Sequence, residues 1–384
     1  MGGRLLTPVE RLVARFPRTG APADGDDWRL LQTSITDAIR RDDETFLLEL
    51  HRASHKHPLL QSWPHQSSFR ALGMLKQPDA LRRFLELAKT PPESEQHRSG
   101  VRTLVDAPAR NLGALLAYAQ DDAMLERELE WFGPEPSLQD LFACWIQERV
   151  VRGSEVARSP FVTAFWERLP SQHPLKALPL RVLPLEEKCI RTSARRGDTL
   201  GNWFEFDGMN WAVNGSPGTW ATAAVEQSCD ARVMASVLSD EALAPNSTWE
   251  GRVFKLERAP LRVETLALFP LKLDCLAAGT PPKMRASTPR EVMALLLQLA
   301  TCGGAYVAAR SAAFGRLLAW RSLRALTGAA DNASFDEVNA LAEQCQWAQF
   351  ESDSDWFAHV VLDVGLVCLR PDARLAVLAM TDSD

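Results

Sequence analysis

Apolar residues recur every three or four positions from the N-terminus to about position 170, which is the period of an amphipathic α-helix. One such segment follows the cap residues Asp26 and Asp27 and places Leu31, Ile35 and Ala38 on one face. The same pattern predicts further helices after Asp43, from Pro78, and at about 108–119, 122–132, 137–151 and 159–168. Helices of this length with short connections favour antiparallel hairpins packed in series.

The period shortens to two between about positions 180 and 276, which indicates β-strands. Within Glu250–Glu257, Arg252, Phe254 and Leu256 would point to one side of a strand and Val253 and Lys255 to the other. The segment over 201–211 carries Asp207-Gly208, a strong hairpin signal. Strand character is also expected over Leu261–Leu273, and one helix is expected at about 221–238.

The C-terminal part is predicted to combine helices and strands. Ser334 and Glu337 have the spacing of a capping box, which predicts a helix over 334–345. Pro371-Asp372 lies between two apolar segments and predicts the turn of a terminal hairpin. The other expected elements are a helical region over 289–328 with a break at Gly303-Gly304, and strands over 356–361, 364–369 and 375–381.

Strands and helices do not alternate regularly, so the pattern favours an α+β fold over a doubly wound sheet. The 384 residues are enough for two or three domains. Prolines gather at 170–184, where the helical pattern ends. We therefore predict an α-helical domain over about 1–172, built of antiparallel helix hairpins, and a mixed α+β domain over about 173–384 that ends in a β-hairpin.

Composition is skewed toward Trp and Arg. The chain has 12 Trp against 2 Tyr, and only 8 of its 43 basic residues are Lys. One interpretation is the codon usage of a GC-rich bacterial genome, and the other is a Trp-lined ligand groove. Because the tryptophans are spread over the whole chain, the first interpretation is favoured.

Charge and patterning exclude several classes of protein. The formal net charge of −6, with no basic run longer than two residues, argues against nucleic-acid binding. The longest mainly apolar stretch, Val292–Ala300, is about half a membrane span, and the N-terminus lacks the apolar core of a secretory signal. The seven cysteines form no CxxC pair, as expected for reduced thiols. These observations predict a cytoplasmic protein without membrane contact.

Four of the seven histidines gather in one short segment, at His51, His55, His57 and His65. His51 and His55 share a helix face, so that His51, His55 and His57 are weak candidates for a metal or proton-sensing site, with His65 nearby. No HExxH spacing is present, and the neighbouring polar residues favour a surface cluster. We therefore expect no metal and no cofactor.

Arg316, Trp320 and Arg324 form a stripe at four-residue spacing in an otherwise apolar helical segment, with Arg321 beside them. A guanidinium in such surroundings needs a carboxylate partner, because an unpaired buried charge costs several kcal/mol. On the same segment, Gly315, Ala319 and Ser322 form a seam of small residues that permits close approach of another element.

Carboxylates follow at Asp355 and Asp363, with Trp356 next to the first. One hypothesis is an Arg–Asp network that attaches the terminal hairpin to the helix. The other is a pocket in which Arg316 and Arg321 hold an anionic ligand and Asp355 or Asp363 acts as a base. The ligand or interface candidates are therefore Arg316, Trp320, Arg321, Asp355, Trp356 and Asp363.

These segments resemble an uncharacterised bacterial family of unknown function, found in actinobacteria and their relatives. The resemblance rests on Gly303–Tyr306, Gly315–Leu323, Trp356-Phe357, Asp363–Leu366, Leu369–Asp372, Leu375–Asp384 and, upstream, Trp249–Phe254. It covers mainly the C-terminal part, over about 245–384, and loosely the helical region over about 99–170. The sequence departs from it at Ala313-Phe314-Gly315, where a second Gly-Ala-Tyr is expected. The resemblance implies no activity, so no catalytic residue follows from it.

No nucleophile elbow, zinc-protease motif, nucleotide-binding loop or kinase motif is present. We therefore expect a non-enzymatic interaction or binding protein whose partner is another protein, within an immunity-like or defence-associated role. The alternative is an enzyme that acts on a small anionic substrate through the Arg/Asp pocket.

Overall fold

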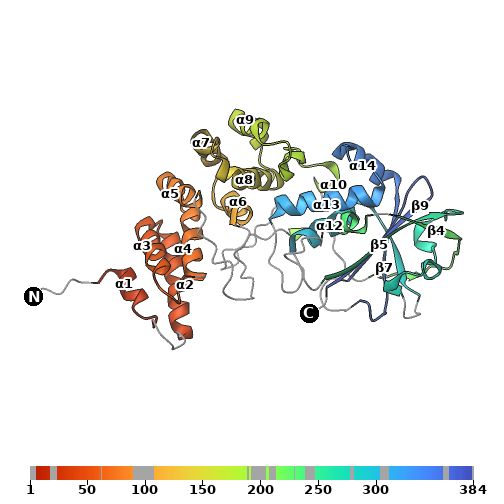
Figure 1. Ribbon diagram of the computed structural model, residues 1–384, viewed down its shortest axis with the longest axis horizontal. Coiled ribbons are helices and arrows are strands. Elements are labelled where there is room, and N and C mark those ends of the chain that lie inside the picture. Colours follow the sequence, from red (N-terminus) through yellow and green to blue (C-terminus); the bar gives the residue numbers. More distant parts are fainter. Residues whose placement is uncertain are drawn as a thin grey trace, which may run out of the picture. The chain divides into compact units, whose positions relative to one another are not determined.

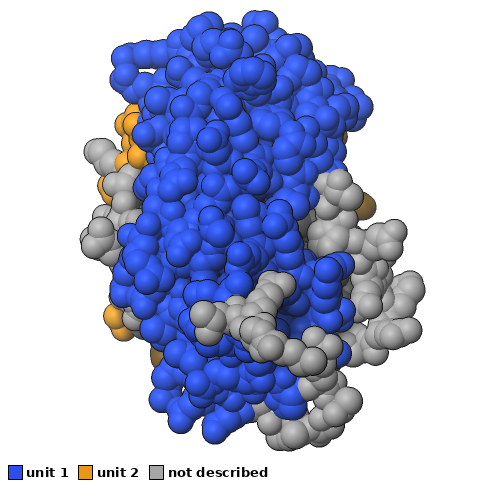
Figure 2. Space-filling view, turned by 90° about the vertical axis from the view of Figure 1, so that its left-hand side faces the viewer, with its two compact units in different colours: residues 1–150, 154–176, 195–202 blue, residues 151–153, 177–194, 203–384 orange. Residues whose placement is uncertain are grey.

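The structure is a computed structural model that describes residues 6–17, 24–61, 63–89, 108–187, 190–191, 205–206, 213–228, 230–237, 247–276, 281–302, 311–357 and 363–382. The chain divides into two compact units, shown in blue and orange in Figure 2. The first unit comprises residues 1–150, 154–176 and 195–202, and the second comprises 151–153, 177–194 and 203–384. The boundary between independent domains near residue 172 stays a prediction.

The first unit is helical, as predicted (Figure 1). Its helices are α1 (Pro8–Val13), α2 (Gly25–Arg40), α3 (Glu44–His55), α4 (Trp63–Met74), α5 (Pro78–Ala88), α6 (Pro108–Ala119), α7 (Asp122–Phe132), α8 (Gln139–Val151) and α9 (Pro160–Arg168). Short 3₁₀ turns connect them at Pro136–Leu138, Val156–Arg158 and Pro174–Ala177. Among the described residues of both units, no helix has the length and apolar character needed to cross a membrane.

Side-chain caps explain where these helices begin. Asp43 accepts a hydrogen bond from the Phe46 N–H, as its position before α3 predicted. Helix α2 begins earlier than predicted, because its cap is Asp24 rather than Asp26 or Asp27. Those two aspartates lie in the first turn, where their charges face the positive end of the helix dipole.

The second unit joins helices to a seven-stranded antiparallel sheet, which confirms the α+β fold class. Its helices are α10 (Pro184–Glu187), α11 (Ala231–Met234), α12 (Pro289–Cys302), α13 (Ala312–Thr327) and α14 (Phe335–Gln344). The strands of the sheet, in spatial order, are β3 (Ser216–Pro217), β6 (Lys283–Ser287), β7 (Gln346–Glu351), β8 (Val364–Leu369), β9 (Arg374–Asp382), β5 (Ser247–Leu256) and β4 (Ala224–Gln227). A separate pair joins β1 (Ile190–Arg191) to β2 (Glu205–Phe206).

Several predicted elements are confirmed. The terminal hairpin is β8–β9, with Leu369 opposite Leu375 at its turn. Ser334 and Glu337 form the capping box of α14. The break expected at Gly303-Gly304, and most of the hairpin expected at 201–211, lie outside the described residues.

Three strand and helix predictions are wrong in part. The region 261–273 contains 3₁₀ turns at Val263–Thr265 and Phe269–Leu271, and another follows at Asp274–Leu276. Leu266, Leu268, Leu271 and Leu273 pack in the core beside the sheet, and only an isolated bridge joins Leu266 to Trp220. The region 221–238 contains the edge strand β4 and only a short helix, α11. Of the strand expected over 356–361, Trp356 and Phe357 lie in a turn and 358–361 lie outside the described residues. Sequence patterning also missed the strands β6 and β7.

Both faces of the sheet are buried near β8, which has no exposed residue. One face packs Phe350, Val367 and Val377 against the leucines of the 261–273 region. On the opposite face α11 lies so close to β5 that a Cβ at Gly251 would approach Met234 and Ala231. Helices α12 and α13 lie side by side in Figure 1.

The sheet contains one glycine whose missing side chain makes room for an aromatic ring. A methyl group at Gly365 would lie 2.6 Å from ring atoms of Phe350, the residue opposite it in the β7–β8 register. Because Phe350 is almost completely buried, its ring has no free space to enter. We expect Gly365→Ala to lower the free energy of unfolding by about 1–3 kcal/mol in urea denaturation.

The matched control is Gly25→Ala in the first turn of α2, where an added methyl group meets no atom within 4 Å. Its free energy of unfolding should stay within about 0.5 kcal/mol of the wild type. Equal effects of the two substitutions would contradict the close approach at Gly365.

Candidate functional site

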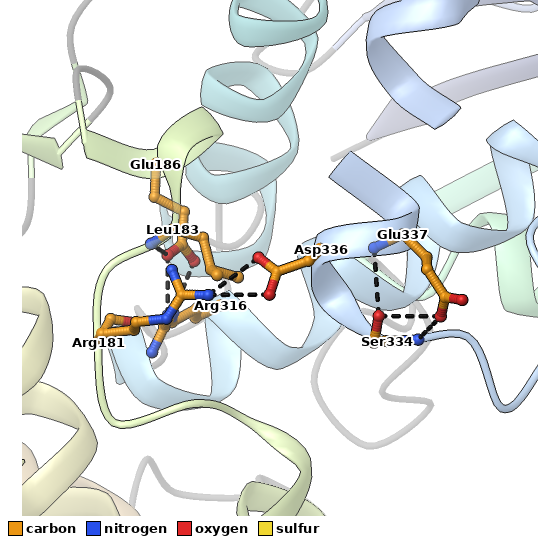
Figure 3. A network of polar contacts seen from close by, with 7 residues as sticks. All are labelled: Arg181, Leu183, Glu186, Arg316, Ser334, Asp336 and Glu337. Carbon is orange, nitrogen blue, oxygen red and sulfur yellow. Dashed lines mark hydrogen bonds and ion pairs between the residues drawn. The ribbon is translucent and has the colours of Figure 1, made fainter. Parts of the chain in front are cut away.

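The polar residues of α13 meet the segment that carries α10. Helix α13 ends at Gly328, whose left-handed backbone (φ 73°) suits glycine. Helix α10 begins with Pro184, and the Glu186 carboxylate accepts a hydrogen bond from the Leu183 N–H at 2.7 Å. This local cap turns the Glu186 side chain toward α13 (Figure 3).

Glu186 and Arg316 form a bidentate ion pair. The Arg316 Nε donates to Glu186 Oε1 at 2.6 Å, and Nη2 donates to Oε2 at 2.8 Å. Both residues are completely buried. Two parallel charge-assisted hydrogen bonds are the geometry in which Arg binds carboxylate most strongly.

The remaining polar atoms of the pair are also engaged. Arg316 donates to the carbonyl oxygens of Pro179 at 3.1 Å and Arg181 at 2.5 Å. The indole N–H of Trp320 donates to Glu186 Oε1 at 2.7 Å. We call Glu186, Arg316 and Trp320 the Glu–Arg–Trp node. Its charges are neutralised within the chain, which is the condition for stable burial of an ion pair.

Surrounding contacts hold α14 beside the node. The Trp320 ring meets Phe335 edge-on, with ring centroids 5.3 Å apart. Arg324 donates to the carbonyl oxygens of Asp331 and Ala333, in the loop before α14. Figure 3 also shows an exposed ion pair between Arg181 and Asp336. The exposed pair contributes little to stability, because water screens it.

The structure brings only two of the six candidates together, Arg316 and Trp320. The carboxylate beside Arg316 is Glu186, which sequence reasoning missed. Arg321 and Asp355 are exposed, and the described residues provide neither with an ion-pair partner. Among the described residues, no ion pair joins Arg316 or Arg321 to Asp355 or Asp363.

The other two candidates contribute to the sheet side of the unit. Trp356 is half-buried against the sheet and packs on Phe357. Asp363 accepts a hydrogen bond from the Thr381 hydroxyl at 2.6 Å, across the terminal hairpin.

The local sequence gave only a weak indication that Glu186 would pair with Arg316. Pro184 and Glu186 have the spacing of the first and third positions of a helix, but Glu186 lies 130 residues from Arg316 in the chain. The partner of Arg316 was expected among the carboxylates that follow α13 closely in the chain. Nothing in the local pattern indicates which distant segment packs on this helix.

The terminal hairpin is attached to α13 by a different arginine from the one expected. Arg370 donates to the carbonyl oxygens of Ala325 and Leu326. These carbonyls belong to the last turn of the helix, where no further turn follows to donate N–H groups to them. The attachment therefore uses helix C-terminal carbonyls and not an aspartate.

The histidine cluster lies between α3 and α4. The rings of His51 and His65 stack with centroids 4.0 Å apart, and His55 lies 5.3 Å from His65. His57 is buried away from them, where its Nε2 contacts the Phe16 carbonyl. Over the described ranges, no group of three or more His, Cys, Asp or Glu residues has the arrangement of a metal site.

The fold and the Glu–Arg–Trp node define an α+β protein whose buried polar residues join the segment around α10 to helix α13. The chain belongs to a Family of unknown function (DUF6183), whose model matches residues 30–384. The match extends far beyond the C-terminal part, so the expectation of a resemblance confined mainly to that part is wrong. No curated protein and no solved structure matches the chain.

Breaking the node should destabilise the second unit. Removing one partner of a buried ion pair leaves the other charge uncompensated, which costs about 3–5 kcal/mol. We expect Glu186→Gln to lower the free energy of unfolding by about that amount, as measured by urea denaturation followed by circular dichroism. Arg321→Ala is the matched control on the same helix and should change it by less than about 0.5 kcal/mol. A small, equal effect of both would show that the ion pair is not structurally important.

The stacked histidines should make stability depend on pH. Each Nδ1 contacts the backbone carbonyl of the other residue, His51 to His65 at 3.2 Å and the reverse at 3.1 Å. Burial, followed by the charge of His65, lowers the pKa of His51 from 6.5 to about 4, and burial lowers the pKa of His65. The unfolded chain therefore binds more protons than the folded one between these values. The stability from this pair is complete above pH 6.5 and falls as the pH drops toward 4.

Between about pH 7.5 and 5, we expect the free energy of unfolding to fall more in the wild type than in His51→Gln. The difference between the two proteins should be on the order of 1–2 kcal/mol. Glutamine keeps a hydrogen-bond donor and does not titrate. Identical pH profiles for the two proteins would refute the role of the stacked pair.

Proposed function

We propose that this protein is a non-enzymatic protein that binds another protein through its helical first unit. The observation that carries the proposal is Trp131 on α7, which is 67% exposed. The Arg82 guanidinium lies over its ring, 5.1 Å from the centroid. Trp and Arg are the residues that most often dominate binding energy in protein interfaces.

The surroundings of Trp131 support a preformed binding surface. Arg82 also pairs with the buried carboxylate of Glu128, at 3.7 Å. One residue further along α7, Phe132 is covered by the Lys89 ammonium at 4.7 Å. We call Arg82, Lys89, Trp131 and Phe132 the α5–α7 face. Because its side chains are already held, binding costs less conformational entropy.

The chemistry of this face indicates the partner. An apolar side chain can stack on the exposed Trp131 ring, and an acidic side chain beside it can reach Arg82. We therefore propose a protein partner that presents a carboxylate next to an apolar residue, in the cytoplasm of a bacterium. Within this proposal, an immunity-like or defence-associated role predicts a toxin or nuclease gene next to the gene for this chain.

The alternative, an enzyme acting on a small anionic substrate, has less support. Its pocket required Arg316 to meet the ligand, but Arg316 is buried and paired with Glu186. Its proposed base, Asp355, is exposed, and Asp363 is hydrogen-bonded to Thr381. No observation therefore favours this alternative over the binding proposal.

Affinity capture with the tagged full chain, from the native host, tests the proposal. A stoichiometric protein partner should be retained by the wild type and lost with Trp131→Ala, with an affinity at least about 30-fold weaker, as for a typical interface hot spot. The matched control is Phe161→Ala on α9, which removes another exposed aromatic side chain, 40% exposed, and should retain the partner. Equal capture by all three proteins, or a small molecule in place of a protein, would overturn the proposal.

A further inference from the structure

Two cysteines lie next to each other on one face of the second unit's sheet. Cys345 is the C-cap of α14, immediately before β7, and Cys368 lies within β8. Trp347 is directly opposite Cys368 in the β7–β8 register. Because residues two apart on an extended chain share a face, Cys345 and Cys368 are diagonal neighbours on the same face.

The two thiols have different environments. Both are free, but Cys345 keeps 8% of its surface exposed, whereas Cys368 is completely buried. A hydrogen bond from Cys368 lowers the pKa of Cys345, and the nearby Arg370 guanidinium acts in the same direction. Burial raises the pKa of Cys368. This asymmetry is typical of an attacking thiol next to a resolving thiol.

We propose that Cys345 and Cys368 form a redox-active dithiol that a hydroperoxide oxidises to an intramolecular disulfide. Cys345, the less deeply buried of the two residues, attacks first, and Cys368 resolves the intermediate. The bond links the end of α14 covalently to β8.

The oxidation balances in two steps. The Cys345 thiolate attacks one peroxide oxygen, the O–O bond breaks, and the other oxygen leaves as water after taking a proton, so Cys345 becomes a sulfenic acid. The Cys368 sulfur then attacks the Cys345 sulfur, the S–O bond breaks, and a second water leaves. Two thiols lose two electrons and two protons, and one hydrogen peroxide is reduced to two waters. A dithiol reductant reverses the result.

Another buried cysteine of the same unit provides a comparison. Cys275 is completely buried, and burial together with the Glu250 carboxylate raises its pKa. The Glu250 carboxylate also accepts hydrogen bonds from the backbone N–H groups of Asp274 and Cys275. A thiol with a raised pKa beside a carboxylate reacts slowly with peroxide. Cys275→Ser is therefore a matched control for a cysteine without the proposed reactivity.

To test the proposal, the full chain is treated with equimolar hydrogen peroxide and its remaining thiols are alkylated. The tryptic peptides are then analysed by mass spectrometry. No Lys or Arg lies between Arg324 and Arg370, so Cys345 and Cys368 stay in one peptide. In the wild type and in Cys275→Ser, this peptide should carry no alkyl group on either cysteine and be two hydrogens lighter than the free dithiol peptide. Treatment with a dithiol reductant before alkylation should restore both alkyl groups.

Two variants separate the roles. Cys368→Ala should stop disulfide formation and leave a Cys345 sulfenic acid that dimedone traps, whereas Cys345→Ser should give neither product. Circular dichroism verifies that each variant is folded. The proposal is overturned if wild-type Cys345 and Cys368 stay alkylated, if a Cys345 sulfenic acid persists in the wild type, or if Cys345→Ser forms the same products.

Discussion

The second unit depends on one interaction, the buried ion pair between Glu186 and Arg316. Transferring two charges from water to a protein interior costs several kcal/mol per ion, and only complete pairing and hydrogen bonding offset that cost. Here the Trp320 indole, the Leu183 N–H and two backbone carbonyls supply the additional bonds. The pair therefore fixes the segment around α10 on α13, because any other position would leave both charges unsatisfied.

Helix α13 connects the node to the rest of the unit. Gly315 packs on Thr301 of α12, where an added Cβ would collide with the threonine methyl, so the predicted seam of small residues does permit close approach. Ser322 on the same helix accepts a hydrogen bond from the Val237 N–H. Arg370 attaches the terminal hairpin to the C-terminal carbonyls of α13. These polar groups of α13 and its neighbours are therefore used to hold elements of the second unit together.

Local patterns predicted local structure well. The helices of the first unit, the capping box at Ser334 and the hairpin after Val364 all depend on contacts within a few residues. The region 261–273 shows the limit of such reasoning, since it was expected to be a strand but most of its leucines pack as side chains over a sheet made by other segments. Trp356 was predicted to begin a strand because it is apolar, whereas its ring packs against that same core.

The sequence by itself determined the class of the fold, most of the helices and the need of Arg316 for a carboxylate. Only the tertiary structure decided that this carboxylate is Glu186, 130 residues away, and that Asp355 and Asp363 have other environments. The physical reason is that an arginine in an apolar segment of sequence already indicates a buried charge, which is costly unless it is paired. The identity of its partner depends on which segments meet, and packing across the whole unit sets that.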